Sequence, residues 1–339
     1  MYKRQLLKLS SNEHYLIITA HHIICDGWSF DVMAQDLSSI YSNLVSGKGN
    51  EFPAPMQMSE YVKYLEDAKT KADYKAQEEF WIKKLSPPLK TADLPVDKSR
   101  SSIRSFSGAR ISSLIDGKLL NNIRDIGNKN RNTFFTTMIS AYAVLLSKLT
   151  NCQDIITGIP TAGQQVVGAD DLIGHCTNLL PLRFDVEGEK SFTQFLSEVK
   201  NIVLDAYENQ QVSYGDILAK LKIKREAGRI PLLSTMFNID PAIMGLKFSD
   251  LDCEMIANPR TGYQFEMGFN LVNSDRECLV ECDYNTDLFS ENSIFKFIKY
   301  YINILEQVVE NTDVKLKDIK ILSSEDMVDL MNMINNINN

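Results

Sequence analysis

The stretch AHHIICDGWS, residues 20–29, places two histidines side by side in a chain that has only four. The apolar, β-branched run that leads into it, Tyr15–His22, predicts a buried strand. Neighbouring residues on a strand point to opposite faces, so we do not expect His21 and His22 to serve one metal or one substrate together. One imidazole should face inward, and the other should face whatever lies across the sheet.

Asp26 and Gly27 follow in a predicted turn, and helical spacing begins at Ser29, which can cap that helix. The pattern brings an imidazole, a carboxylate and a glycine amide to a helix N-terminus, where developing negative charge is stabilised. A neutral imidazole can take a proton from an attacking nucleophile near neutral pH. Because the chain contains no GxSxG motif, direct acyl transfer between two bound substrates fits better than a covalent acyl-enzyme.

Two other interpretations of these residues stay open. The histidine pair can be purely structural, with both rings satisfied by backbone groups in a core. A metal site built from His22, Asp26, His175 and Cys176 is the second, although these residues do not form a compact ligand set in the sequence.

The composition excludes several classes of protein. The formal net charge is −8 and the sequence pI is about 5.2, without a basic cluster interleaved with aromatic residues, so no nucleic-acid partner is expected. No run of about 18 apolar residues and no signal peptide is present, so no membrane association is expected. The six cysteines lie apart and lack a CxxC pair, which indicates reduced thiols in a cytoplasmic protein.

Strands and helices interleave along the chain, which predicts an α/β or α+β protein with two lobes. The segment 87–107 carries three prolines and clustered charge, and it is the candidate linker between the lobes. The expected helices are 29–47, 59–85, 116–126, 133–149, 191–208 and 290–310, and the expected strands are 15–22, 154–160, 232–239, 251–257, 265–273 and 277–284.

Five motifs in order along the chain, and a sixth segment that looks like the connector into an adenylation domain, resemble one family. They are HHIICDGWS (21–29), MSEYVKYLE (58–66), DDLIGHCTNLLPLR (170–183), YENQQVSYGDIL (207–218), REAGRIPLLSTMFNID (225–240) and LKDIKILSSEDMVDLMN (316–332). The family is that of the condensation domains of nonribosomal peptide synthetases, relatives of chloramphenicol acetyltransferase, which carry an HHxxxDG active-site motif. One departure is Asn209, which stands where the family usually has a histidine.

The resemblance implies an α/β fold of two chloramphenicol-acetyltransferase-like lobes in a V, with His22 in a tunnel between them. Residues 1–100 would form the N-terminal lobe, left incomplete because the two family motifs that precede HHxxxDG are absent. Residues 101–322 would form the C-terminal lobe, and residues 323–339 would connect it to a following adenylation domain.

The resemblance also implies an acyltransferase that makes an amide bond. Donor and acceptor would arrive as thioesters on the phosphopantetheine arms of carrier proteins, and the acceptor amine would attack the donor carbonyl. The domain itself would bind no cofactor and no metal. Its partners would be the donor and acceptor carrier proteins and the downstream adenylation domain of one megasynthase.

Individual roles carry over motif by motif. His22 would act as the base or position the amine, and His21 would be structural. Gly27 would lie close to the substrate, or would serve only a tight turn. Asp26 would form a structural ion pair with Arg183. A possible polar group of the tunnel is Asn238.

The wording of GHCTNLLPLR and RIPLLSTMFNID is closest to condensation domains that follow polyketide modules. This favours a polyketide-derived donor, with an L-aminoacyl or peptidyl donor as the other choice. Two alternatives to the enzyme remain: a catalytically inactive module of the same fold that docks carrier proteins, and a free-standing acyltransferase that uses coenzyme A thioesters.

Overall fold

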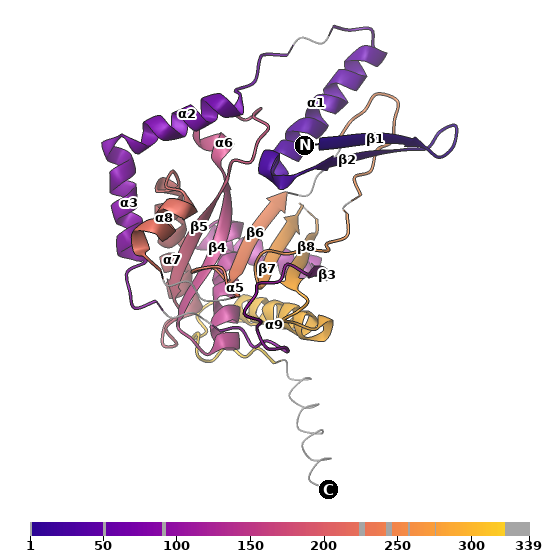
Figure 1. Cartoon of the computed structure of the whole chain (residues 1–339). Helices are drawn as coiled ribbons and strands as arrows, with labels where there is room; N and C mark the ends of the chain where they lie inside the picture. The colour runs from indigo at the N-terminus through magenta and orange to yellow at the C-terminus, as the bar shows by residue number, and fades with distance from the viewer. Residues whose placement is uncertain are drawn as a thin grey trace. The chain divides into compact units, whose positions relative to one another are not determined.

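The computed structural model describes residues 2–49, 52–89, 93–223, 228–241, 246–256, 258–274 and 276–322 (Figure 1). The chain divides into two compact units. Unit 1 comprises Met1–Gln77, Thr161–Asn178 and Ile243–Ile256. Unit 2 comprises Glu78–Pro160, Leu179–Ala242 and Ala257–Asn339. The expected connector, 323–339, lies outside the described residues.

Unit 1 contains a hairpin and helices. Its two strands pair antiparallel with Tyr2 opposite Ala20 and Lys8 opposite His14, and apolar side chains such as Leu16 remain exposed. The elements are β1 (Tyr2–Lys8), β2 (His14–Ala20), the 3-10 turn η1 (His22–Ile24), α1 (Gly27–Val45), α2 (Met58–Lys69) and α6 (Gly163–Val166). The strand expected at 15–22 is therefore present but ends two residues earlier, and it is exposed where a buried strand was expected.

Helix α1 begins differently from the prediction. Asp26, not Ser29, is its N-cap, and Ser29 occupies the third helical position, where its hydroxyl accepts from the Asp26 backbone N–H. This reciprocal arrangement is a capping box, with a serine in place of the more usual glutamate or glutamine. The predicted stop at Gly47 agrees with the structure, because α1 ends at Val45 and Gly47 has a φ of +67°.

Unit 2 is built on a sheet with the strand order β3-β8-β7-β6-β4-β5. The pairs β3–β8 and β7–β8 are antiparallel, whereas β6 is parallel to both β7 and β4. The strands are β3 (Gly108–Ile115), β4 (Asp154–Ala162), β5 (Thr177–Asp185), β6 (Thr235–Pro241), β7 (Met267–Asn273) and β8 (Cys278–Asn285), and the ends of β4 and β5 reach into unit 1.

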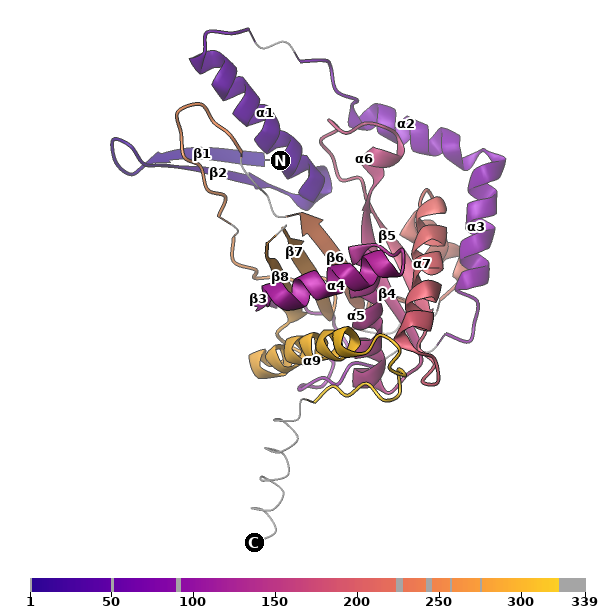
Figure 2. The same ribbon diagram turned by 180° about the vertical axis from the view of Figure 1, so that it is seen from behind.

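Helices of unit 2 cover one face of this sheet (Figure 2). They are α4 (Gly117–Lys129), α5 (Phe134–Thr150), α7 (Phe192–Glu208) and α9 (Glu291–Glu310). Unit 2 also contains α8 (Tyr214–Leu221), and the division between the units falls within the sequence of α3 (Ala72–Lys84). Helix α5 is buried on all sides from Thr136 to Leu146, because it packs against α4, α7, α9 and strand β6.

The core of unit 2 centres on the Tyr142 ring of α5. Its centroid lies 5.2 Å from that of Phe237 and 5.0 Å from that of Phe269. Tyr301 of α9 closes the cluster edge-on to Phe269 at 5.3 Å, and its hydroxyl donates to the Met138 carbonyl at 3.0 Å. Each fully buried aromatic ring of this kind stabilises the fold by roughly 1.5–3 kcal/mol.

Most elements predicted from periodicity are present, and two more differ from the structure. The stretch 59–85 forms two helices, α2 and α3, with a break at Thr70 and Lys71. Residues 252–256 form no strand, because the run is followed by polar residues and takes only a single bridge between Phe248 and Leu251. Strands β1, β3 and β5 were not predicted.

The candidate linker packs onto unit 2 where it is described. The Leu94 side chain is buried, and the Asp97 backbone N–H donates to the Leu288 carbonyl at 2.9 Å. The Asp97 carboxylate accepts from the Ser290 backbone N–H and the Ser293 hydroxyl at the start of α9. These bonds fasten the segment along the first turn of that helix.

Within the described ranges no single helix has the length and apolar composition of a membrane span, although the bent pair α4 and α5 meets that test together.

Candidate active site

The two adjacent histidines lie in the turn between β2 and α1. Strand β2 ends at Ala20, so the prediction that both histidines stand on a strand is wrong. His21 caps the 3-10 turn instead, and its Nδ1 accepts from the Ile23 backbone N–H at 3.1 Å. His22 is the first residue of that turn and is exposed. Both histidines are exposed, and the His21 ring also closes the backbone of the turn.

Asp26 is the buried anchor of this turn, with 2% of its surface exposed. Its carboxylate accepts from the Ser29 backbone N–H at 2.9 Å, from the Cys176 backbone N–H at 3.0 Å and from Thr177 Oγ1 at 3.2 Å. Gln164 Nε2 lies 3.1 Å and 3.3 Å from its two oxygens. The carboxylate thus ties the start of α1 to the segment 161–178.

Neutral donors keep the Asp26 carboxylate charged. Burial by itself raises the pKa of a carboxyl group, because it disfavours the charged form. Here the hydrogen bonds from Ser29, Cys176 and Gln164 outweigh burial, and the pKa of Asp26 lies below its usual range. The site contains a buried anion that needs no cation beside it.

Arg183 has a different partner from the one predicted. Its guanidinium binds Asp154 in a two-pronged ion pair at 2.7 Å and 2.8 Å. It also donates to the carbonyls of Ser86 at 2.9 Å and Pro88 at 3.0 Å. The predicted ion pair with Asp26 is therefore wrong. Asp26 is satisfied by uncharged groups, whereas Arg183 holds the chain after α3 against strands β4 and β5.

Gly27 is the first residue of α1. Its φ is not in the left-handed region, and a Cβ atom built on it would meet nothing within 4 Å. The chain itself therefore does not need a glycine here for a tight turn. Backbone N–H groups in the first turn of a helix have no partner within the helix, so they can face a polar group outside it.

A third histidine, His175, contacts His22. Their ring centroids lie 4.9 Å apart with the planes at 89°. The pKa of His175 is lowered by burial and by the neighbouring His22, an effect that the Asp26 charge opposes. The structure thus brings together His22, Asp26, His175 and Cys176. No group of three or more histidine, cysteine or acidic side chains placed to hold a metal ion occurs among the described residues.

One partner of Asp26, Gln164, was not predicted from the sequence. It is completely buried in the short helix α6, just after β4, and lies in none of the motifs. Gly163 beside it lies so close to its neighbours that a Cβ would come within 2.4 Å of the Cys176 carbonyl. Burial and the Asp26 charge raise the pKa of the Cys176 thiol to about 12, so this thiol stays protonated.

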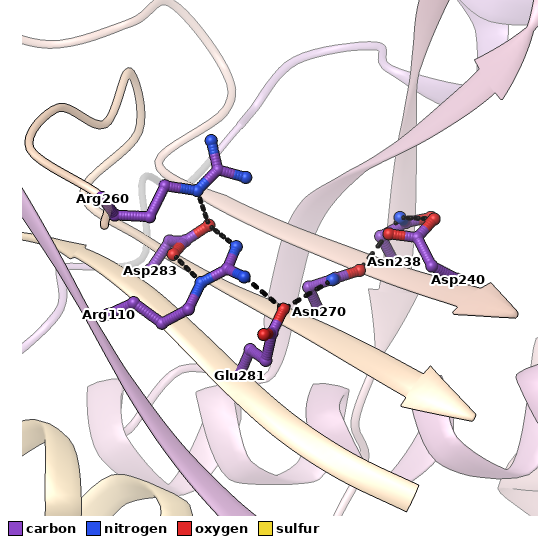
Figure 3. Close-up of polar contacts among 7 residues, drawn as sticks. All are labelled: Arg110, Asn238, Asp240, Arg260, Asn270, Glu281 and Asp283. Carbon is purple, nitrogen blue, oxygen red and sulfur yellow. Dashed lines mark hydrogen bonds and ion pairs between the residues drawn. The ribbon is translucent and has the colours of Figure 1, made fainter. Parts of the chain in front are cut away.

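Asn238 belongs to a polar ladder on the sheet of unit 2 (Figure 3). Its Nδ2 donates to Asp240 Oδ1 at 2.8 Å and to Asn270 Oδ1 at 3.0 Å. Asn270 Nδ2 donates in turn to Glu281 at 3.0 Å, and Arg110 binds both Glu281 and Asp283. Both amide hydrogens of Asn238 are therefore used inside the ladder.

Comparison with known proteins identifies the family. The family model of the condensation domain matches residues 1–331. Bacitracin synthase 1 of Bacillus licheniformis is 32% identical over 334 residues, which are 98% of this chain but only 6% of that synthase.

Two solved structures show the same fold. The X-domain from teicoplanin biosynthesis superposes with a TM-score of 0.84 at 21% identity, over 95% of this chain and 75% of that one. The first condensation domain of the calcium-dependent antibiotic synthetase, in complex with a substrate analogue, gives a TM-score of 0.77 at 16% identity over 95% and 70%. The predicted mixed α/β fold class is confirmed.

Proposed function

This chain belongs to the condensation domain family, and from that membership we propose that it joins a donor acyl or peptidyl thioester to the amine of an acceptor aminoacyl thioester. The observation that carries the proposal is the turn after β2. The exposed His22 begins this turn, α1 follows at Gly27, and the buried Asp26 between them caps the helix. An exposed base beside a helix N-terminus suits attack on a carbonyl.

His22 would act on the acceptor nitrogen. An α-amine has a pKa near 8, so part of it is neutral before it binds. As its nitrogen bonds to the donor carbonyl carbon it becomes cationic, and His22 takes the excess proton. The carbon–sulfur bond then breaks, and the leaving thiolate receives a proton to become a thiol. Holding the amine in line with the carbonyl can by itself lower the reaction barrier by about 7 kcal/mol in favourable cases.

The neighbouring residues would support this step without touching the reacting atoms. His21 closes the turn through the Ile23 backbone N–H, and Asp26 fixes the turn to the segment 161–178. Gly27 leaves room for the substrate at the start of α1. Within unit 2, Arg183 holds the chain after α3, and we propose Asn238 as a polar group for the substrate.

We also propose that the chain works within a megasynthase, as the family suggests. The thioesters would be carried by phosphopantetheine arms on donor and acceptor carrier proteins in a cytoplasmic megasynthase that also contains an adenylation domain. The amino-acid sequence of the motif GHCTNLLPLR favours a polyketide-derived donor. The domain boundaries after residues 100 and 322 remain part of this proposal.

The test is to incubate the chain, expressed from its full gene, with loaded donor and acceptor carrier proteins and to weigh the acceptor carrier intact. An acceptor heavier by one donor acyl group supports the proposal. A parallel arm supplies the donor as its coenzyme A thioester. Product in that arm alone indicates the free-standing acyltransferase, and carrier binding without product in either arm indicates the docking module; both results would overturn the proposal.

A further inference from the structure

A second imidazole lies against the proposed catalytic one. The ring of His175 meets that of His22 edge to face, with centroids 4.9 Å apart and planes at 89°. Aromatic rings favour this arrangement over face-to-face stacking. His175 comes from the segment 161–178 and not from the turn itself, so the contact is formed by the tertiary fold of unit 1.

The backbone on both sides of His175 is fixed to the capping box of α1. The Cys176 N–H donates to Asp26 Oδ2 at 3.0 Å, and the Gly174 N–H donates to Ser29 Oγ at 3.0 Å. Ser29 is completely buried, and its Oγ also lies 2.9 Å from the Gly174 carbonyl oxygen. The turn that carries the other imidazole runs directly into the same capping box, so one buried pair positions both rings.

The Gly174 position adds a steric reason for this path. A Cβ atom there would come within 2.6 Å of Met58 Sδ on α2, so a side chain would require Met58 to move. The hydrogen bonds to α1 thus hold the backbone beside His175, and the Met58 side chain packs against the same glycine.

Burial and two neighbouring charges act on the pKa of His175. The charges that act on it are those of His22 and Asp26. Burial lowers the pKa of His175, and a cation on His22 lowers it further, while the Asp26 carboxylate opposes both.

We propose that His175 is a positioning residue whose ring supports one side of the His22 imidazole and holds it in the orientation that meets the acceptor amine. This inference rests on the proposed function, and it concerns ring contact and not proton transfer by His175. An exposed histidine without such support would rotate freely about its side-chain bonds. Small errors of placement near a reacting atom cost large factors in rate.

The kinetic test compares His175→Ala and His175→Phe in the loaded-carrier assay, with His14→Ala as the control on an exposed histidine of β2. We expect His175→Ala to lower kcat about tenfold or more with KM for the acceptor unchanged, because only orientation is lost. His175→Phe keeps a ring edge and should stay within about threefold of the wild type. Wild-type kcat in His175→Ala, or an equal loss in His175→Phe, overturns the proposal.

A second measurement does not depend on activity. The chain has only four histidines, so the imidazole NMR signals can be assigned by single replacements. We expect ring-to-ring NOEs between His22 and His175, and His22 signals displaced by the neighbouring ring in the wild type and in His175→Phe but not in His175→Ala. If wild-type His22 gives no such NOE and resembles exposed His14, the inference is wrong. Absence of product with the wild type would instead refute the proposed function and leave this measurement decisive.

Discussion

Replacement of Asp26 should destabilise unit 1 far more than the loss of an ordinary helix cap. In Asp26→Ala, the backbone N–H groups of Ser29 and Cys176 and the side-chain amide of Gln164 lose their acceptor in a buried site. A buried donor left without a partner costs about 1–3 kcal/mol. Three such donors, eased by water that enters the vacated space, give about 3–5 kcal/mol.

Asp26→Asn separates charge from shape. The asparagine amide has nearly the same size and still offers one oxygen to the Ser29 N–H. Its NH2 group, however, is a donor and cannot accept the hydrogen bonds that the second carboxylate oxygen accepted. We expect an intermediate cost of about 2 kcal/mol. The matched control is Asp116→Ala, which removes the exposed N-cap of α4 and its bonds to the N–H groups of Lys118 and Leu119. That substitution should cost about 1 kcal/mol.

The assay can follow unit 1 separately. The chain has two tryptophans, of which Trp28 lies in unit 1 and Trp81 in unit 2. In a Trp81→Phe background, urea unfolding followed by Trp28 fluorescence reports the free energy of unfolding of unit 1. The control Asp116→Ala lies in unit 2, so its cost is measured through Trp81 in a Trp28→Phe background. If Asp26→Ala costs no more than Asp116→Ala, the carboxylate does not organise the turn, and the reasoning about this site is refuted.

Three further predictions follow. The pKa of Asp26 lies below its usual range, so the charged carboxylate contributes its full stability above about pH 4 and loses it as the pH falls through the native pKa. The difference in unfolding free energy between the wild type and Asp26→Asn should therefore shrink as the pH falls through that range. A difference that grows there would show that the pKa of Asp26 is not lowered. Gly27→Ala should leave the unfolding free energy unchanged, since its Cβ meets no atom within 4 Å, but should lower kcat/KM; equal activity would remove any need for a glycine. Arg183→Lys cannot keep both the paired bonds to Asp154 and those to the carbonyls after α3, so unit 2 should lose about 1–2 kcal/mol of unfolding free energy. The measurement follows Trp81 in a Trp28→Phe background. Wild-type stability would show that these bonds do not hold the segment after α3.

Helical periodicity and capping residues were the parts of the fold that the sequence predicted well. Helices α7 and α9 begin right after Ser191 and Ser290, whose hydroxyls accept from backbone N–H groups of the first turn. These signals are local, because a cap and an apolar stripe lie within a few residues of each other. Strands β1, β3 and β5 lacked such signals, since edge strands and mixed burial blur the alternation on which strand prediction depends.

The site was predicted in part. The motif placed His22, Asp26 and Gly27 together correctly at the start of a helix. It could not show that the strand ends before the histidines, because a 3-10 turn of apolar residues has the same composition as the end of a strand. The partners of Asp26 could not be inferred either. They are a backbone amide, a hydroxyl and a glutamine from a segment far along the chain, and none of them has a charge that would suggest a pair.

The most direct test of the central claim is a single-turnover rate. Loaded donor and acceptor carrier proteins are mixed with the wild type, with His22→Ala and with the exposed control His14→Ala, and the amide product is followed by intact mass. The account predicts that His22→Ala lowers the rate about a hundredfold or more, a loss typical of general base catalysis, while His14→Ala keeps the wild-type rate. Equal rates for the wild type and His22→Ala would contradict it.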